Sequence, residues 1–343
     1  KFAISTNSAT SALHISCLAL GLKKGDKLWT TPNTFVASAN CGLYCGADID
    51  FVDIDINTGL ICIEHLKEKL IFADKKGNLP KIIIPVHFSG TSCEMRELKK
   101  LKEKYGFSII EDGSHSIGGS YHSYPVGCCK FSDITVFSFH PVKIITTGEG
   151  GMITTNNENL SLRLRTLRSH GIIKDQNKFI SKNKFSWSYE QQLLGFNYRM
   201  SDINAALGMS QLKRLEKIVK ERNKIFSNYK KTLRDLPLKL LEIPENVTSS
   251  VHLAVVLLNE EMKNKHEKIF NLMRSSKIGV QLHYIPVHTQ PFFKELGFNE
   301  NDYPVSLNYS KRAMSLPLYI GLSDADQEYV SNILRKHIES CFN

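Results

Sequence analysis

Residues 136–155 read VFSFHPVKIITTGEGGMITT, and this stretch decides the fold. An apolar, strand-like run ends at Phe139, one lysine follows at Lys143, and a turn with three glycines leads into a second strand-like run at residues 150–155. A lone lysine usually points into water. A lysine beside glycines, which let a ligand approach the backbone closely, can also react with that ligand. Whether Lys143 is an exposed lysine or one that reacts with a ligand depends on the other segments of the sequence.

The composition is typical of an ordinary soluble protein. Hydrophobic residues make up 42% and charged residues 23% of the 343 positions. The longest apolar runs have the length of strands, so we expect no membrane segment. The formal net charge is +10, with the lysines spread over predicted helical faces. This spread favours a solvated surface, suited to a phosphorylated small molecule, over nucleic-acid binding.

The cysteines and the first residues indicate the cellular setting. Eight cysteines occur without a Cys-x-x-Cys pair, which favours a reducing cytosol and a cytoplasmic protein. Cys41 and Cys45 form a weak candidate for metal binding, and we predict no metal site. The chain starts at Lys1 inside a strand-like run, KFAIS, and no basic, apolar leader precedes it. We therefore expect the natural protein to begin earlier, with a further N-terminal segment.

Strand-like and helical patterns alternate over the first 160 residues. The apolar strand-like runs are residues 1–6, 26–31, 49–54, 81–87, 107–113, 133–139 and 150–155. Helical patterns separate the first five of them. This alternation predicts an α/β fold with a mostly parallel sheet covered by helices on both faces. Ligands should then gather beyond the carboxyl ends of the strands.

A long amphipathic stretch without proline follows at residues 201–233. Its apolar positions are Ile203, Ala206, Leu207, Met209, Leu212, Leu215 and Ile218. Such a stretch can cross from one domain to the next. The strand-like and helical patterns after it predict a smaller α+β domain. We therefore predict a large domain over residues 1–215 and a small C-terminal domain over residues 216–343.

The segment NSATSAL, residues 7–13, follows the first predicted strand. Asn7 or Ser8 can cap a helix there, which leaves the amides of Ala9, Thr10 and Ser11 free. Free amides and the helix dipole bind anions, and the Thr10 hydroxyl adds a donor, so a phosphate would fit. An ordinary cap without a ligand is the alternative.

Asp112 stands at the end of a buried strand in the segment IIEDGSHSIG. A carboxylate is costly there unless a cation meets it. A protonated pyridine nitrogen would be such a partner. His115 could bond a substituent of the same ring, or it could be a loop histidine without a ligand.

These segments suggest a chemical role for Lys143. An aldehyde cofactor requires a partly desolvated lysine that loses its proton and forms a Schiff base. Ser138, at the end of the preceding strand, can reach the same phosphate as Thr10. The sequence GEGGM lacks the spacing of a dinucleotide fingerprint, and no Walker loop occurs. The combination therefore favours an aldehyde cofactor with a pyridine ring and a phosphate over nicotinamide or a nucleoside triphosphate.

Eight segments together are similar to the DegT/DnrJ/EryC/StrS-type sugar aminotransferases, in the same order and over essentially the whole chain. They are NSATSAL, TPNTFVASAN, EDGSHSIG, FSFHPVKIITTGEGGMITTN, RSHG, GFNYRMSDINAALGMSQL, HYIPVH and SLPLYIGLSDADQEYV. The resemblance implies a pyridoxal-phosphate enzyme of the aspartate-aminotransferase-like (type I) fold, with a seven-stranded sheet. Within the family the chain most resembles transaminases that aminate C4 of a UDP-4-keto-6-deoxy-N-acetyl-hexosamine on the route to pseudaminic acid, because His115 stands where many relatives carry glutamine.

The same resemblance implies roles for individual residues. Lys143 and Asp112 would be catalytic, with Lys143 bonded to the cofactor aldehyde and Asp112 paired with the pyridine nitrogen. The residues implied to bind the cofactor are Ala9, Thr10, Phe35, Asp112, His115, Ser138, Lys143 and Asn197. Asn197 would come from the other subunit of a homodimer. The segments implied to lie near the nucleotide sugar contain Arg199, His283 and His288. L-glutamate would be the amino donor.

Two alternatives remain open from the sequence. Another 4-keto or 3-keto nucleotide-sugar aminotransferase, or a sugar dehydratase of the same fold, would share most of these motifs. In the dehydratase branch a histidine replaces the Schiff-base lysine, and Lys143 argues against it. A non-catalytic regulatory or binding scaffold is the alternative from another class.

Overall fold

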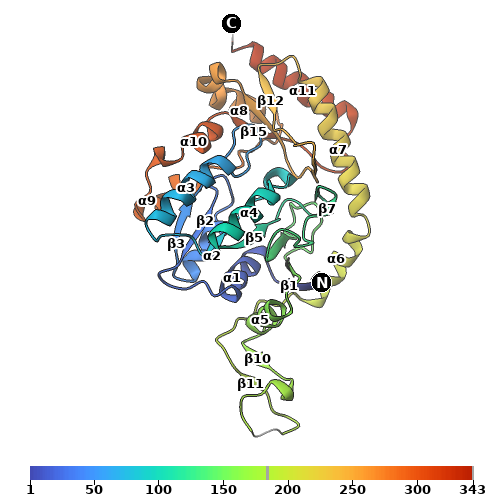
Figure 1. Ribbon diagram of the computed structural model, residues 1–343. Coiled ribbons are helices and arrows are strands. Elements are labelled where there is room, and N and C mark those ends of the chain that lie inside the picture. The colour runs from blue at the N-terminus through green and yellow to red at the C-terminus, as the bar shows by residue number, and fades with distance from the viewer. Residues whose placement is uncertain (183–184, 342–343) are drawn as a thin grey trace.

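A seven-stranded sheet forms the centre of the molecule (Figure 1). The computed structural model describes residues 1–182 and 185–341. In order across the sheet, the strands are β1 (Phe2–Thr6), β9 (Gly151–Thr155), β8 (Ile134–Ser138), β5 (Ser108–Asp112), β4 (Ile82–Ile83), β2 (Lys27–Thr30) and β3 (Asp48–Phe51). β9 runs antiparallel to β1 and β8, and the pairs from β8 to β3 are parallel. The predicted, mostly parallel sheet is confirmed.

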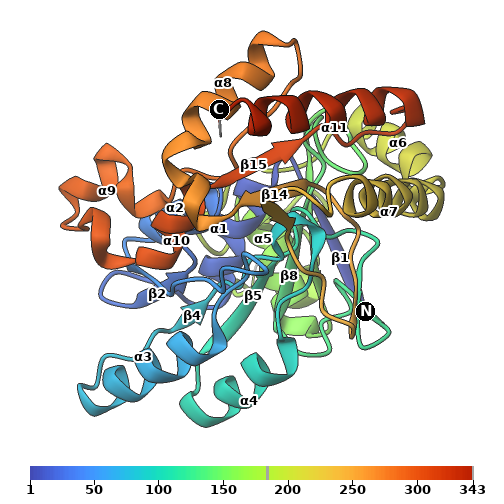
Figure 2. The same cartoon turned by 90° about the horizontal axis from the view of Figure 1, so that it is seen from above.

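Helices cover both faces of this sheet (Figure 2). One face packs against α1 (Ala9–Ala19), α2 (Ala37–Tyr44) and α5 (Glu158–Arg168), and the other against α3 (Ile63–Lys75) and α4 (Met95–Tyr105). Successive strand residues point to opposite faces. In β5, Ile110 accordingly packs with the first group and Ile109 with the second. The strands therefore read as continuous apolar runs.

The stretch predicted as one amphipathic segment consists of two helices, α6 (Asp202–Leu212) and α7 (Leu215–Thr232). The break falls at Arg214, whose φ of −105° and ψ of 0° leave the helical region. α7 buries Ile218 and Val219 against the lysine-bearing loop, but no residue of α6 is buried. The stretch is thus not one continuous helix, and only its second half packs its apolar positions against the core.

The C-terminal part forms a second sheet with helices beside it. Its three strands, β12 (Leu238–Leu240), β14 (Ala254–Leu258) and β15 (Ala313–Leu316), pack with α7, α8 (His266–Ser275) and α11 (Asp324–Glu339). Leu253 and Leu257 also reach the core under α3 and α4, so the two parts share apolar contacts. The boundary between residues 215 and 216 stays a prediction.

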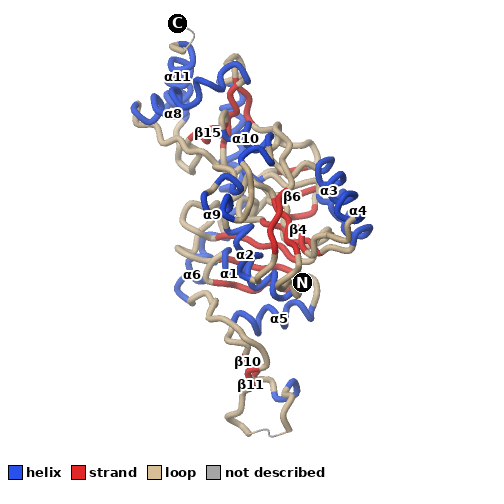
Figure 3. The backbone as a smooth tube through the Cα atoms, turned by 90° about the vertical axis from the view of Figure 1, so that its left-hand side faces the viewer, coloured by secondary structure: helices blue, strands red, loops and turns tan. Residues whose placement is uncertain are grey.

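The remaining elements are short. They are β6 (Ser120–Tyr121), β7 (Tyr124–Pro125), β13 (Val247–Thr248), α9 (Pro291–Glu295) and α10 (Pro304–Ser310), with 3-10 turns at Phe88–Gly90, Gln176–Lys178, Glu260–Lys265, Val287–Thr289 and Glu300–Asp302. The strands β10 (Ile172–Ile173) and β11 (Glu190–Gln191) form the base of an arm that projects away from the sheet (Figure 3). Among the described helices, none combines the length and apolar character that crossing a bilayer requires.

Candidate active site

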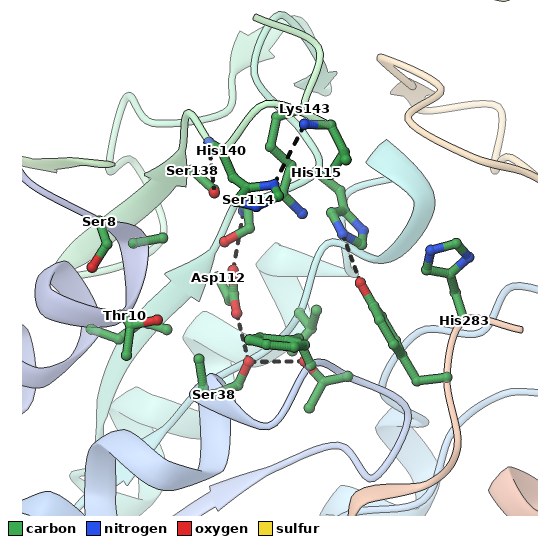
Figure 4. Close-up of a pocket in the computed structure, with 18 of the residues that line it drawn as sticks. Ser8, Thr10, Ser38, Asp112, Ser114, His115, Ser138, His140, Lys143 and His283 are labelled. Atoms are coloured by element: carbon green, nitrogen blue, oxygen red, sulfur yellow. Dashed lines mark hydrogen bonds between the residues drawn. The ribbon is translucent and has the colours of Figure 1, made fainter. Parts of the chain in front are cut away.

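A cavity of about 350 Å³ lies at the carboxyl ends of β5 and β8 (Figure 4). The predicted residues that line it are Ala9, Thr10, Phe35, Asp112, His115, Ser138, Lys143 and His283. In the close-up, Ser8 and Thr10 lie on one side of this space, and His115 and His283 lie on the other. Parallel strands end at the same edge of a sheet, where helix N-termini and loops supply polar groups. The topology therefore gathers residues that are far apart in the sequence.

The N-terminus of α1 forms one wall of the cavity. Ser8 is the N-cap, and its Oγ accepts the Ser11 amide at 3.1 Å. The first helical bond runs from the Ala12 amide to the Ser8 carbonyl oxygen. The amides of Ala9 and Thr10 have no acceptor among the described residues. Together with the helix dipole they can bind a phosphate.

Asp112 is buried at the end of β5. Its Oδ2 accepts the Ser38 hydroxyl at 2.6 Å, and its Oδ1 accepts the Ser114 amide at 3.1 Å. Ser38 lies on α2 and is bonded in turn to the Thr34 hydroxyl at 2.8 Å. Donors to a carboxylate favour its charged form. Both donors therefore fix the orientation of a buried carboxyl group that can meet a cationic ring nitrogen.

His115 lies beside the cavity and is almost fully buried. Its Nε2 is 3.2 Å from the Tyr284 hydroxyl, and its Nδ1 has no hydrogen-bond partner among the described residues. Burial, together with the positive charge of Lys143, holds the pKa of His115 well below its usual value. The same two causes lower the pKa of His283 to about 4. Both imidazoles are therefore neutral near pH 7.

The backbone around Lys143 is fixed by buried neighbours. Ile144 and Ile145, which follow the lysine, are buried against Phe137 and Phe139 and hold the loop in place. The Lys143 amide donates to the His140 carbonyl oxygen at 2.9 Å. The amide of Phe139 bonds to the Gly150 carbonyl oxygen and closes the loop. The lysine side chain thus extends into the cavity from a rigid base.

The amine of Lys143 is mostly desolvated. Burial lowers its pKa to about 8, although the carboxylate of Asp112 acts in the opposite direction. Its Nζ has no hydrogen-bond partner among the described residues. A lysine with this pKa carries a useful fraction of free amine near neutral pH, and free amine is the form that attacks an aldehyde.

Two of the three glycines after Lys143 serve protein packing. A Cβ at Gly150 would lie 2.2 Å from Thr147 Oγ1, and one at Gly151 would lie 2.6 Å from the Ser8 carbonyl group. Gly148 has a φ of +78°, which favours glycine. The prediction that all three admit a ligand was wrong, because protein atoms fill the space beside Gly150 and Gly151.

Three predicted residues do not line the cavity. Asn197 and Arg199 are exposed on the segment between the arm and α6, and Arg199 borders a separate basic cavity with Arg165 and Arg168. His288 is completely buried, and its Nε2 is 3.0 Å from the Glu300 carbonyl oxygen. Its predicted position near the sugar does not fit, because it is a core histidine packed against other aromatic rings.

The structure also adds residues that the sequence did not single out. Ser38 holds Asp112, Tyr284 holds His115, and the ring of His252 packs at a tilt against the ring of His115. Ser38 and Tyr284 lie inside segments that the motifs contain, TPNTFVASAN and HYIPVH. That position was the available signal for both of them. For His252 the sequence held no such signal.

Comparison with known proteins places this site in context. The model of the DegT/DnrJ/EryC1/StrS aminotransferase family matches residues 1–335. A UDP-4-amino-4,6-dideoxy-N-acetyl-β-L-altrosamine transaminase of Campylobacter jejuni is 38% identical over 340 residues, which is 99% of this chain and 86% of the relative.

Solved structures give the same result. The aminotransferase PseC of Helicobacter pylori, involved in the biosynthesis of pseudoaminic acid, has a TM-score of 0.90 and 31% identity and covers 99% of this chain and 87% of its own. The PLP-form of the putative sugar aminotransferase Spr1654 of Streptococcus pneumoniae has a TM-score of 0.87 and 26% identity, with 98% and 87% covered.

Proposed function

Because the chain belongs to the DegT/DnrJ/EryC1/StrS family of pyridoxal-phosphate-dependent sugar aminotransferases, we propose that it aminates C4 of a UDP-4-keto-6-deoxy-N-acetyl-hexosamine. L-glutamate is the proposed amino donor. The observation that carries the proposal is the desolvated amine of Lys143, which shares a cavity with the buried carboxylate of Asp112. The relatives that act on an amino-altrosamine nucleotide and in pseudoaminic acid biosynthesis support this choice of sugar.

The residues of the cavity fit pyridoxal phosphate. The unpaired amides of Ala9 and Thr10 and the hydroxyl of Ser138 would hold the phosphate, and Asp112 would pair with the ring nitrogen. Phe35 is 60% exposed at the cavity, so its ring is free to stack on a flat ligand. When bound, the cofactor supplies an aldehyde that accepts the amino group and a ring that withdraws electrons.

The side chains of this chain then perform the binding and proton-transfer steps. With the cofactor bound, Lys143 would be the group that takes up and returns the proton, because its amine lies in the cavity and burial lowers its pKa to about 8. Asp112, oriented by Ser38, would pair with the ring nitrogen and favour its protonated form. His115 and His283 stay neutral beside the substrate space and so offer hydrogen bonds without adding charge.

A mass-spectrometric assay of products from a panel of 4-keto nucleotide sugars, with L-glutamate, tests the proposal. We expect a glutamate-dependent amino product, largest for the UDP-linked N-acetyl sugar, and none for Lys143→Ala. A dehydrated product without nitrogen would support the sugar dehydratase, and an amino product only from other keto sugars would support another nucleotide-sugar aminotransferase. No product from any sugar would support the non-catalytic scaffold.

We further propose that two copies form a homodimer and complete each other's sites. Asn197 is exposed and lies outside the cavity of its own chain, as a residue contributed to a second copy must. α6, next to it, leaves Ile203 84% and Met209 68% exposed. On the arm, Trp187 is 78% exposed. A second copy would cover these apolar side chains.

A further inference from the structure

The loop of residues 249–252, which precedes β14, packs directly against His115. The ring centroids of His252 and His115 are 4.3 Å apart with an angle of 39° between the planes. The Ser250 hydroxyl donates to the His115 carbonyl oxygen at 2.9 Å. The loop therefore contacts both the ring and the backbone of a residue in the cavity wall. His252 itself is buried and does not line the cavity.

The backbone of this loop is strained. Val251 is buried and has a φ of +47°, a conformation that β-branched residues rarely adopt. Arg222 on α7 holds it in place: its Nε donates to the Val251 carbonyl oxygen at 2.9 Å and its Nη2 to the His252 carbonyl oxygen at 2.8 Å. A conformation of this kind persists only where the surroundings enforce it, and such places concentrate at functional sites.

The other side of the loop is equally constrained. The His252 amide donates to the Ser89 carbonyl oxygen at 2.8 Å, and the Ser250 amide donates to that of Gly90 at 3.1 Å. A Cβ at Gly90 would lie only 2.9 Å from the His252 amide nitrogen and 2.7 Å from Ser250 Oγ. The position of the His252 ring is thus set by contacts on both sides.

The surroundings of His115 and His252 keep the two rings uncharged. Burial is the main cause that lowers the pKa of each ring, followed by the positive charge of Lys143. His283 acts on both rings in the same direction, and Arg222 acts on His252. Neither Nδ1 atom has a hydrogen-bond partner among the described residues. The orientation of His115 therefore depends on the Tyr284 hydroxyl and on the rings packed around it, of which His252 is nearer, at 4.3 Å, than Phe88 at 6.0 Å and Tyr284 at 6.2 Å.

We propose that His252 is a positioning residue of the cofactor site, which acts by packing its ring against His115 and holding that imidazole toward the bound pyridoxal phosphate. This proposal rests on the role given to His115 under the proposed function. The contact requires an aromatic ring at position 252 and no proton transfer by it. A phenylalanine should therefore replace the histidine, whereas a residue without a ring should not.

A double-mutant cycle on cofactor binding tests this proposal. The dissociation constant of pyridoxal phosphate is measured by absorbance titration of the apo-protein for His252→Ala, His252→Gln and His252→Phe, each with His115 intact and with His115→Ala. Since an aromatic pair contributes about 0.5–1.5 kcal/mol, we expect His252→Ala and His252→Gln to weaken binding by about 2- to 13-fold. His252→Phe should stay within about twofold of the wild type.

The variants that also carry His115→Ala test whether His252 acts through His115. With His115→Ala in the background, the loss caused by His252→Ala should disappear; an equal loss there, or unchanged binding in the single variants, overturns the proposal.

Thermal unfolding of each apo-protein reports damage to the fold, and His252→Gln, which keeps most of the volume, serves if His252→Ala does not fold. His266→Ala, a half-buried histidine bonded to the Ala313 carbonyl oxygen, is the matched control. Failure of the proposed function would instead show as absent binding in the wild type.

Discussion

Lys143 differs from the other lysines of the chain in its surroundings. Its neighbours Ile144 and Ile145 are buried and hold the loop, and burial of the amine lowers its pKa to about 8. The nearest acidic influence, Asp112, keeps the pKa from falling further. Reactivity at this residue is therefore set by the balance between desolvation and one carboxylate.

The rate at which apo-protein takes up pyridoxal phosphate should depend on this balance. Free amine increases as pH rises, so the rate of growth of visible absorbance should increase through a midpoint near pH 8 and level off above it. Asp112→Asn removes the charge that raises the pKa, and should move the midpoint to lower pH. A midpoint at the ordinary lysine value, or no movement in Asp112→Asn, would contradict this account.

Ser38 is the second residue whose importance comes from its surroundings. Its hydroxyl is a 2.6 Å donor to the buried carboxylate of Asp112. We expect Ser38→Ala to lower the free energy of unfolding by about 1.5 kcal/mol or more, because a hydrogen bond to a charged group is lost. Thr34→Val, which removes a bond between two neutral hydroxyls, is the matched control and should cost less. Urea denaturation measures both.

At the scale of elements, β5 serves the site through its two faces. Asp112 points to the cavity, while the preceding residue, Glu111, points to the other side and is also buried. Glu111 accepts from the Thr135 hydroxyl at 2.9 Å and from the Ser132 hydroxyl, and its Oε2 is 2.7 Å from His87 Nε2. The Cys93 amide donates to the other ring nitrogen of His87, which orients the ring. This network fixes the strand that carries Asp112.

Removing one partner of the network should be costly. His87→Ala removes a hydrogen-bond partner from the buried Glu111 carboxylate, so we expect the free energy of unfolding to fall by about 2 kcal/mol or more. The double variant His87→Leu, Glu111→Leu removes the charge as well and should recover a large part of that loss. Chemical denaturation of the three proteins gives the comparison. Equal stability of the single and double variants would show that the carboxylate is satisfied without His87.

At the scale of the whole molecule, several of the most exposed apolar residues lie on the arm and on α6. α6 carries Ile203 and Met209, and the arm carries Ile180 and Trp187, all of them largely exposed. The arm projects from the body of the molecule in Figures 1 and 3. Apolar surface of this extent on a single copy indicates an interaction site. Asn197 lies on the segment between the arm and α6, so the proposed dimer would place it at the partner's cavity.

Mixing two inactive variants tests the proposed sharing of sites. Lys143→Ala and Asn197→Asp, each alone, should have little or no activity. If each site takes Lys143 from one copy and Asn197 from the other, co-refolded mixtures contain hybrid dimers with one intact site, and recover about a quarter of wild-type activity. Mixing Lys143→Ala with Asp112→Asn supplies the control, since both defects fall on the same side of a site. Equal recovery in both mixtures would show separate, unshared sites.

The sequence by itself determined the elements and their order. The seven strands and the helices between the first five of them follow from local periodicity, and a helix cap at Asn7 or Ser8 follows from residue type next to a strand end; the structure has Ser8 as the cap. These properties depend on neighbours along the chain, and the printed sequence contains those neighbours. The location of the ligand site, at the edge of the sheet where the parallel strands end, followed from the predicted topology.

Only the tertiary structure decided which residues meet. Ser38 bonds to Asp112 across 74 positions and Tyr284 to His115 across 169, and neither contact has a local signal. Packing between distant segments also explains why His288 is a core residue, although its segment was expected near the sugar. It explains as well why α6 is exposed, although its apolar positions suit a buried helix face. Packing between segments that folding brings together decides which side chains are buried, how His252 contacts His115 and how far the pKa of Lys143 is lowered. A local sequence pattern does not contain that information.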